Sequence, residues 1–137
     1  VAIATALFML GCLSWPPLAI HVHDGRAEVD VRSLGEYGTA ISRIRLTCHG
    51  NSEVIWDVAN PDSPQIPGFA LQVGENSVLP GRLRDFGFRV STPATAESFR
   101  LATGVEYVIE VWAEGQRKVA SQVFRFEDSG AVPSPPP

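Results

Sequence analysis

Two histidines separated by one residue are the side chains in this sequence best suited to bind a metal ion. They are His21 and His23, and the alternation of residues 19–23 predicts a β-strand. Residues two apart on a strand point to the same side, so both imidazoles would face one ligand, with Asp24 or His49 as a third donor. The more ordinary interpretation is that both histidines are solvated residues on an exposed strand face.

Catalytic motifs are absent from the sequence. Cys48 and His49 are adjacent on a predicted strand, where neighbouring side chains point to opposite faces, so the thiol and the imidazole cannot easily meet. There is no G-x-S-x-G elbow, no glycine-rich phosphate loop and no H-E-x-x-H motif. Glu106 and Glu110 fall on the polar face of a strand, where charges keep a domain soluble. The sequence therefore predicts a protein that is not an enzyme and needs no cofactor.

The charge balance argues against nucleic acid as a partner. The 137 residues include 11 basic and 15 acidic side chains, which gives a formal net charge of −4. Binding to a phosphate backbone requires a clustered basic surface, and here the basic residues are scattered without a run. The length suits one domain, and 45% hydrophobic residues are enough for a single core.

The first 19 residues have the composition of an export leader. Residues 1–13 are almost wholly apolar, and this run is shorter than the ~20 residues that a membrane-spanning helix needs. Within it, Met9-Leu10-Gly11-Cys12 resembles a bacterial lipobox, in which a small residue precedes a cysteine that becomes lipidated. The resemblance implies that Cys12 carries a lipid anchor. Cleavage after Ala19 and an uncleaved anchor are the alternatives. The leader predicts an exported protein on the periplasmic or cell-surface side.

Alternating apolar residues predict short antiparallel strands between residues 20 and 127. The clearest signal is residues 101–126, where two alternating runs flank a polar turn at 114–117, as in a β-hairpin. Asp24-Gly25 predicts another tight hairpin. Repetition of this pattern gives seven to nine strands, which is typical of an all-β sandwich with Trp56 in its core. The other strands are expected at residues 26–32, 41–48, 53–59, 69–73, 83–91 and 98–101, and the run 83–91 carries Phe86, Phe88 and Val90 at alternate positions.

The end of this region resembles a known family. Leu101-x-x-Gly104-x-x-Tyr107, followed by alternation through Ala113, is similar to the corresponding part of fibronectin type III and related immunoglobulin-like domains. The resemblance implies a single antiparallel immunoglobulin-like β-sandwich over residues 20–127, in which Tyr107 packs across a corner and its hydroxyl bonds to nearby backbone. Thr103 replaces the proline that is usual in the family, and the fold implies no particular activity.

A proline-containing loop is the best candidate for a partner-binding surface. Residues 60–68 hold three prolines, which stiffen the loop so that little conformational entropy is lost when a partner docks. A loop that only connects two sheets is the alternative. The predicted contact residues are Pro61, Pro64, Ile66, Pro67 and Phe69.

These features together predict a non-catalytic module of the cell envelope that binds another protein or a surface polymer. Cys12 would hold it to the membrane, and residues 128–137 would form a disordered proline-rich tail. The alternative function is a small periplasmic protein that binds a metal ion through His21 and His23.

Overall fold

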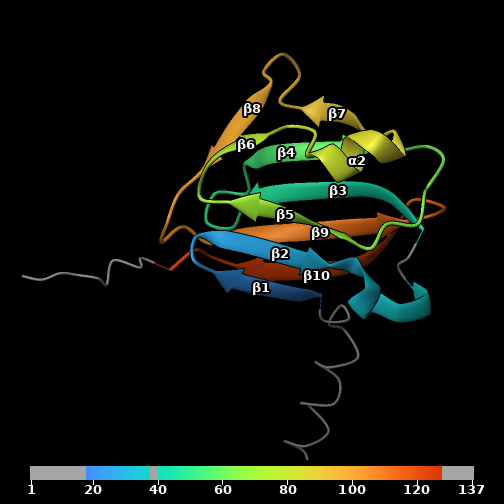
Figure 1. Ribbon diagram of the computed structural model, residues 1–137, viewed down its shortest axis with the longest axis horizontal. Helices are drawn as coiled ribbons and strands as arrows, with labels where there is room; N and C mark the ends of the chain where they lie inside the picture. Colours follow the sequence, from blue (N-terminus) through green and yellow to red (C-terminus); the bar gives the residue numbers. More distant parts are fainter. Residues whose placement is uncertain (1–17, 38–39, 128–137) are drawn as a thin grey trace, which may run out of the picture.

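The computed structural model describes residues 18–37 and 40–127, and within these ranges the chain is an antiparallel β-protein (Figure 1). The described ranges contain ten strands, against the seven to nine that the sequence predicts. The unexpected strand is β6, because Gly74, Glu75 and Asn76 have the composition of a turn. The strands are β1 (Ala19–His23), β2 (Arg26–Asp30), β3 (Ile41–Cys48), β4 (Val54–Ala59), β5 (Gly68–Gln72), β6 (Gly74–Ser77), β7 (Arg89–Thr92), β8 (Ser98–Leu101), β9 (Tyr107–Ala113) and β10 (Arg117–Phe124).

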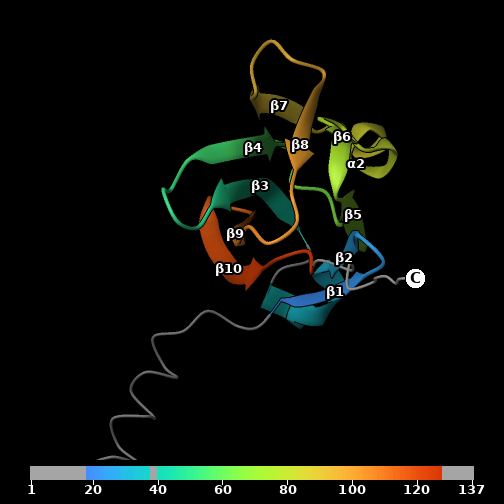
Figure 2. The same ribbon diagram turned by 90° about the vertical axis from the view of Figure 1, so that its left-hand side faces the viewer.

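The strands form three antiparallel sheets. One sheet has the order β1-β2-β5, the second has the order β10-β9-β3-β4-β7, and β6 pairs with β8 in the third. The view in Figure 2 runs along the strands and shows β1, β2 and β5 on one side and β10, β9, β3 and β4 on the other. Both predicted hairpins are present: Asp24 and Gly25, each with a positive φ, turn β1 into β2, and β9 turns into β10.

The core lies between these sheets and is centred on Trp56 of β4. The Trp56 ring is fully buried and meets Phe69 of β5 edge-on, with 5.8 Å between ring centroids. It also stacks on Phe99 of β8 at 5.4 Å, and its Nε1 donates to the carbonyl of Val78 at 2.8 Å. Buried side chains from all three sheets belong to one hydrophobic cluster, which is consistent with a β-sandwich. The placement of Trp56 in the core is confirmed.

Tyr107, the first residue of β9, closes a corner of the structure. Its ring is 3% exposed and lies 5.8 Å from the ring of Phe124. The backbone N–H of Ala102 donates to the Tyr107 hydroxyl at 2.8 Å. The hydroxyl therefore ties the segment that follows β8 to the start of β9, in the geometry expected from the sequence.

Replacing Tyr107 by phenylalanine is expected to lower the free energy of unfolding by about 1–2 kcal/mol. The apolar contacts of the ring remain, but the Ala102 N–H loses its partner in a half-buried place. Urea denaturation of the two proteins measures the difference. Unchanged stability would mean that water replaces the hydroxyl at no cost.

The predicted strand over residues 83–91 is wrong in its first half. The structure has a short helix there, α2 (Gly81–Phe86), which ends at Gly87 with a left-handed φ of 94°. Leu83 is the buried residue of α2, while Phe86 is 39% exposed. The alternation of Phe86, Phe88 and Val90 arises because the chain changes direction at Gly87, which returns only the last part to strand β7.

Part of the predicted leader belongs to the folded domain. Leu18 is 2% exposed and lies in the hydrophobic core, and Ala19 begins β1. Cys12 and the tail at residues 128–137 lie outside the described residues. In the ranges that the structure describes, no helix has the length and apolar character needed to span a membrane.

A second helical segment, the 3₁₀ turn Val31–Tyr37, connects β2 to the region before β3. Val31 and Leu34 are buried, so this segment covers one end of the core. The N–H of Val31 donates to the carbonyl of Pro67 at 3.0 Å. This bond fixes the end of β2 against the start of β5, the two strands that border the candidate site.

Candidate functional site

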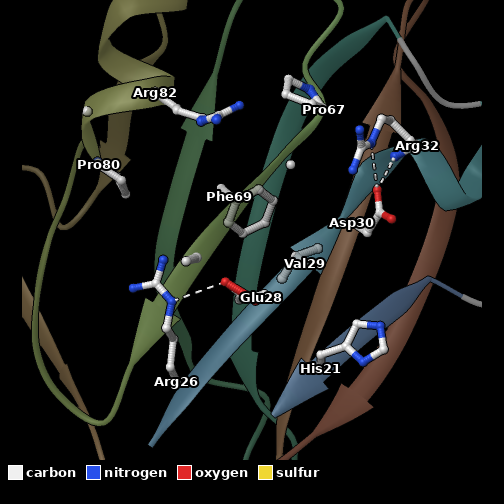
Figure 3. Close-up of a pocket in the computed structure, with 13 residues that line it drawn as sticks. His21, Arg26, Glu28, Val29, Asp30, Arg32, Pro67, Phe69, Pro80 and Arg82 are labelled. Carbon is white, nitrogen blue, oxygen red and sulfur yellow. Dashed lines mark hydrogen bonds and ion pairs between the residues drawn. The ribbon is translucent and has the colours of Figure 1, made fainter. Parts of the chain in front are cut away.

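An open groove of about 610 Å³ lies on the outer face of the β1-β2-β5 sheet (Figure 3). Its volume is within the usual range for ligand sites, roughly 300–1,000 Å³. The start of α2 forms one wall, and charged side chains from β2 form the other. The floor contains backbone of β5. The lining residues are His21, Arg26, Glu28, Val29, Asp30, Arg32, Pro67, Gly68, Phe69, Ala70, Pro80, Gly81 and Arg82.

The charges of the groove are unevenly paired. Arg26 Nε lies 3.4 Å from Glu28 Oε1, and Arg32 Nε lies 3.2 Å from Asp30 Oδ1. Arg82 extends from α2 over the groove and has no ion pair with the residues that the structure describes (Figure 3). Three arginines thus face two carboxylates, which gives the groove a net charge of +1 in a protein whose formal net charge is −4. The groove favours an anionic group near Arg82.

The predicted metal ligands are at one side of this groove. His21 and His23 are exposed residues of β1 on one face of the strand, as expected, and His21 lines the groove. His23 Nε2 lies 3.0 Å from Asp24 Oδ2, with both side chains about 85% exposed. Within residues 18–37 and 40–127, no three histidine, cysteine or acidic side chains are grouped so as to hold a metal ion. Neither Asp24 nor His49 completes a site with both histidines, so the metal hypothesis gains no support.

The prediction that the proline loop presents its apolar residues to a partner is wrong for two of them. Ile66 is 3% exposed and Phe69 is 6% exposed, so both side chains are part of the core. The loop backbone is also fixed, since Pro64 accepts a hydrogen bond from the N–H of Ile41 at 2.9 Å. The apolar residues beside the prolines anchor the loop.

The remaining loop residues are at the surface to different degrees. Pro61 is exposed, and Pro64 and Pro67 are half-buried. Of these three prolines, only Pro67 lines the groove. The structure therefore brings one predicted contact residue, Pro67, and the buried Phe69 to the groove, and it leaves Pro61 and Pro64 outside the lining.

A second group of charged side chains covers the outer face of the five-stranded sheet. Asp57 of β4 has a side chain only 5% exposed and accepts hydrogen bonds from Arg43 at 2.8 and 3.0 Å and from Arg45 at 3.1 Å. The hydrogen bonds that Arg43 donates to the Asp57 carboxylate raise the pKa of Arg43 above its ordinary value, although desolvation opposes them. A pKa that is raised in the folded state stabilises the fold at every pH below the ordinary pKa of arginine. This contribution is therefore fully present at neutral pH.

Trp112 of β9 lies beside the same cluster. The Arg45 guanidinium is 5.1 Å from its ring centroid, the Arg43 guanidinium is 6.0 Å away, and the Lys118 ammonium is 5.4 Å away. Lys118 also forms an ion pair with Glu110. The cations and carboxylates of this cluster are engaged with one another across β4, β3, β9 and β10, so we assign it a structural role.

Sequence reasoning missed both the groove and the Asp57 cluster. Arg43 and Arg45 alternate with the apolar Ile44 and Leu46, but their partner Asp57 follows only from the register in which Arg45 is opposite Asp57. Arg82 was assigned no role, because the helix that carries it was not expected. The one available signal was Asp57 itself, an acidic residue between the inward-facing Trp56 and Val58 of a predicted strand.

Comparisons with protein-family models, with curated proteins and with solved structures found no match for this chain.

Proposed function

We propose that this chain is a non-catalytic binding module of the cell envelope, with an immunoglobulin-like β-sandwich fold, and that it binds another protein or a surface polymer through the groove. The observation that supports a binding role most strongly is the groove itself, with the unpaired Arg82 above a floor of β5. A concave site with convergent polar groups is the default candidate for a ligand-binding surface.

The strand order supports the immunoglobulin-like assignment at both ends of the chain. In such domains the first two strands lie in one sheet, and the third strand lies in the other sheet with the last two, next to the penultimate strand. Here β1 and β2 share one sheet, and the order β10-β9-β3 occurs in the second. The Tyr107 hydroxyl bond adds to this similarity. The departure lies in the middle of the chain, where β6, α2, β7 and β8 separate β5 from β9.

The charge arrangement in the groove supports the non-catalytic part of the proposal. A carboxyl group that acts as general acid or base must be free to exchange a proton with a substrate. The two carboxylates that line the groove, Glu28 and Asp30, each have an arginine beside them. The placement in the envelope rests on the apolar residues 1–13 and on Cys12 in its lipobox-like motif.

Site-specific photo-crosslinking in the native cells tests this proposal. A photoreactive amino acid replaces Glu28, an exposed groove residue, and in a matched control it replaces Val123, an exposed residue of β10 on the other sheet. We expect a discrete adduct in the envelope fraction from position 28 and none from position 123. Equal crosslinking from both positions, or adducts found only in the cytoplasmic fraction, would contradict the proposal.

A further inference from the structure

We propose that the groove receives an extended acidic peptide segment of a partner protein, which adds as a strand to the free edge of β5. This inference rests on the proposed binding function and narrows it from a protein or a polymer to a peptide main chain. Its basis is a set of backbone groups that have no hydrogen-bond partner among the described residues, beside a guanidinium that has no ion pair with them.

β5 is the last strand of its sheet. It pairs with β2 on one side, from Arg26 opposite Gln72 to Asp30 opposite Gly68, and the described residues provide no strand on its other side. This ladder has no register shift along its five residues. The far edge of β5 is therefore a regular row of main-chain groups, the feature that another extended chain recognises.

The direction of each main-chain group on β5 follows from its neighbours. The carbonyl of Pro67 accepts from Val31, and the N–H of Val73 donates to Gly25, so both of these groups point towards β2. In a trans peptide the C=O and the following N–H point in opposite directions. With the regular alternation of an antiparallel ladder, the N–H and C=O groups of Gly68, Ala70 and Gln72 all point away from β2.

One of these three residues already has a surrogate partner. The side-chain amide of Asn76, which is 7% exposed, donates to the carbonyl of Gln72 at 2.8 Å and accepts from its N–H at 2.8 Å. Asn76 thus imitates a neighbouring strand at the end of β5. Among the described residues, none forms such bonds with the outward groups of Gly68 and Ala70, and both residues line the groove.

The opposite wall determines which kind of chain fits. Pro80 and Arg82 lie on the opposite side of the groove from Phe69 of β5 (Figure 3), and Gly81 also lines the groove. The unpaired Arg82 supplies a partner for a carboxylate, through charge-assisted hydrogen bonds. A peptide main chain matches the spacing of the Gly68 and Ala70 groups, which a polysaccharide does not, and this match favours an acidic peptide.

A selection from randomised octapeptides tests the inference on the folded protein. The library is selected on the wild type and counter-selected on Ala70→Pro, which removes an outward N–H without removing a bond to β2. Ala70→Ser, which keeps that N–H, is the matched control. We expect enrichment of sequences rich in aspartate or glutamate that bind the wild type and Ala70→Ser and fail to bind Ala70→Pro. Circular dichroism and thermal denaturation check that each variant is folded.

Synthetic versions of the enriched peptides give a test that leaves the protein unchanged. Two sets of peptides are N-methylated, one at the odd-numbered and one at the even-numbered positions. Methylation of the set whose N–H groups face β5 should abolish binding, and methylation of the other set should have little effect. Arg82→Ala should weaken binding of an acidic peptide about tenfold. For the same peptide with asparagine and glutamine in place of aspartate and glutamate, the affinity should change by no more than about twofold. Arg84→Ala, a change at another exposed arginine of the same helix that does not line the groove, should have no effect.

Three outcomes would overturn the inference. They are a selection that enriches nothing over Ala70→Pro, methylation that is equally harmful in both sets of peptides, and equal effects of Arg82→Ala and Arg84→Ala. If any of these occurs while position 28 still crosslinks to an envelope component, the peptide inference fails and the binding function stands. If position 28 gives no adduct either, both fail.

Discussion

Replacing Trp56 by alanine is expected to lower the free energy of unfolding by about 3–5 kcal/mol, the range found when a large aromatic side chain is removed from a core. The ring is fully buried and contacts Phe69 and Phe99. Its loss would leave a cavity between the sheets and would also leave the Val78 carbonyl without its donor. Urea denaturation followed by far-ultraviolet circular dichroism measures the change.

The matched control is Trp112→Ala, the same substitution on the outer face of the five-stranded sheet. Trp112 is half-buried and contacts charged side chains of Arg43, Arg45 and Lys118, so its loss should cost less, about 1–2 kcal/mol. A Trp56→Ala protein as stable as Trp112→Ala would contradict the placement of Trp56 at the centre of the core.

Replacing Asp57 by asparagine is expected to lower the free energy of unfolding by about 2–4 kcal/mol. The substitution keeps the size of the side chain but removes the negative charge of the carboxylate, whose oxygens accept three hydrogen bonds from Arg43 and Arg45. Two guanidiniums would then lie close together without a counter-ion. Because the arginine side chains are about 30% exposed, water offsets part of the cost. Chemical denaturation at low and high salt measures the loss.

Glu28→Gln provides the control for Asp57→Asn. Glu28 forms its ion pair with Arg26 at 3.4 Å, and both side chains are more than half exposed, so the stability should hardly change. If Glu28→Gln and Asp57→Asn have the same effect, then burial of the Asp57 carboxylate does not contribute to stability. A loss for Asp57→Asn that vanishes in high salt would show that the ion pair is fully solvated.

The parts of the fold that the sequence could predict are those defined by local pattern. The Asp24-Gly25 turn and the long hairpin of β9 and β10 follow from alternation and turn chemistry within about 25 residues of chain. Tyr107 and Trp56 were expected inside because each occupies an inward position of a strongly alternating strand. In these places local preference and the global fold agree.

The α2 helix could not be predicted in the same way. Phe86, Phe88 and Val90 satisfy the period of a strand, and a helix of six residues is too short to show a helical period. The left-handed conformation at Gly87 separates α2 from β7, and the hydrophobic pattern does not show whether a glycine adopts this conformation. For this reason the sequence did not predict the wall of the groove that α2 forms, and it did not indicate that Arg82 lies on this wall.

The groove floor depends on pairing between distant parts of the chain. Arg26 lies opposite Gln72, and this register decides which groups of Gly68 and Ala70 face outwards. The sequence predicts both strands but not that they pair, nor that the residues described by the structure place no strand beyond β5. The burial of Ile66 and Phe69 was not predicted either. The prolines around them indicated a surface loop, but their side chains pack in the core.

The irregularity in β10 has a consequence for self-association. β10 is the outer strand of its sheet, and its register with β9 shifts between Lys118 and Ala120. A shift of this kind bends the strand and interrupts the row of groups that a second copy would need in order to continue the sheet. The proposed peptide site at the edge of β5 is therefore compatible with a protein that does not form fibres, because the interrupted edge at β10 disfavours continuous sheets between copies even at high concentration.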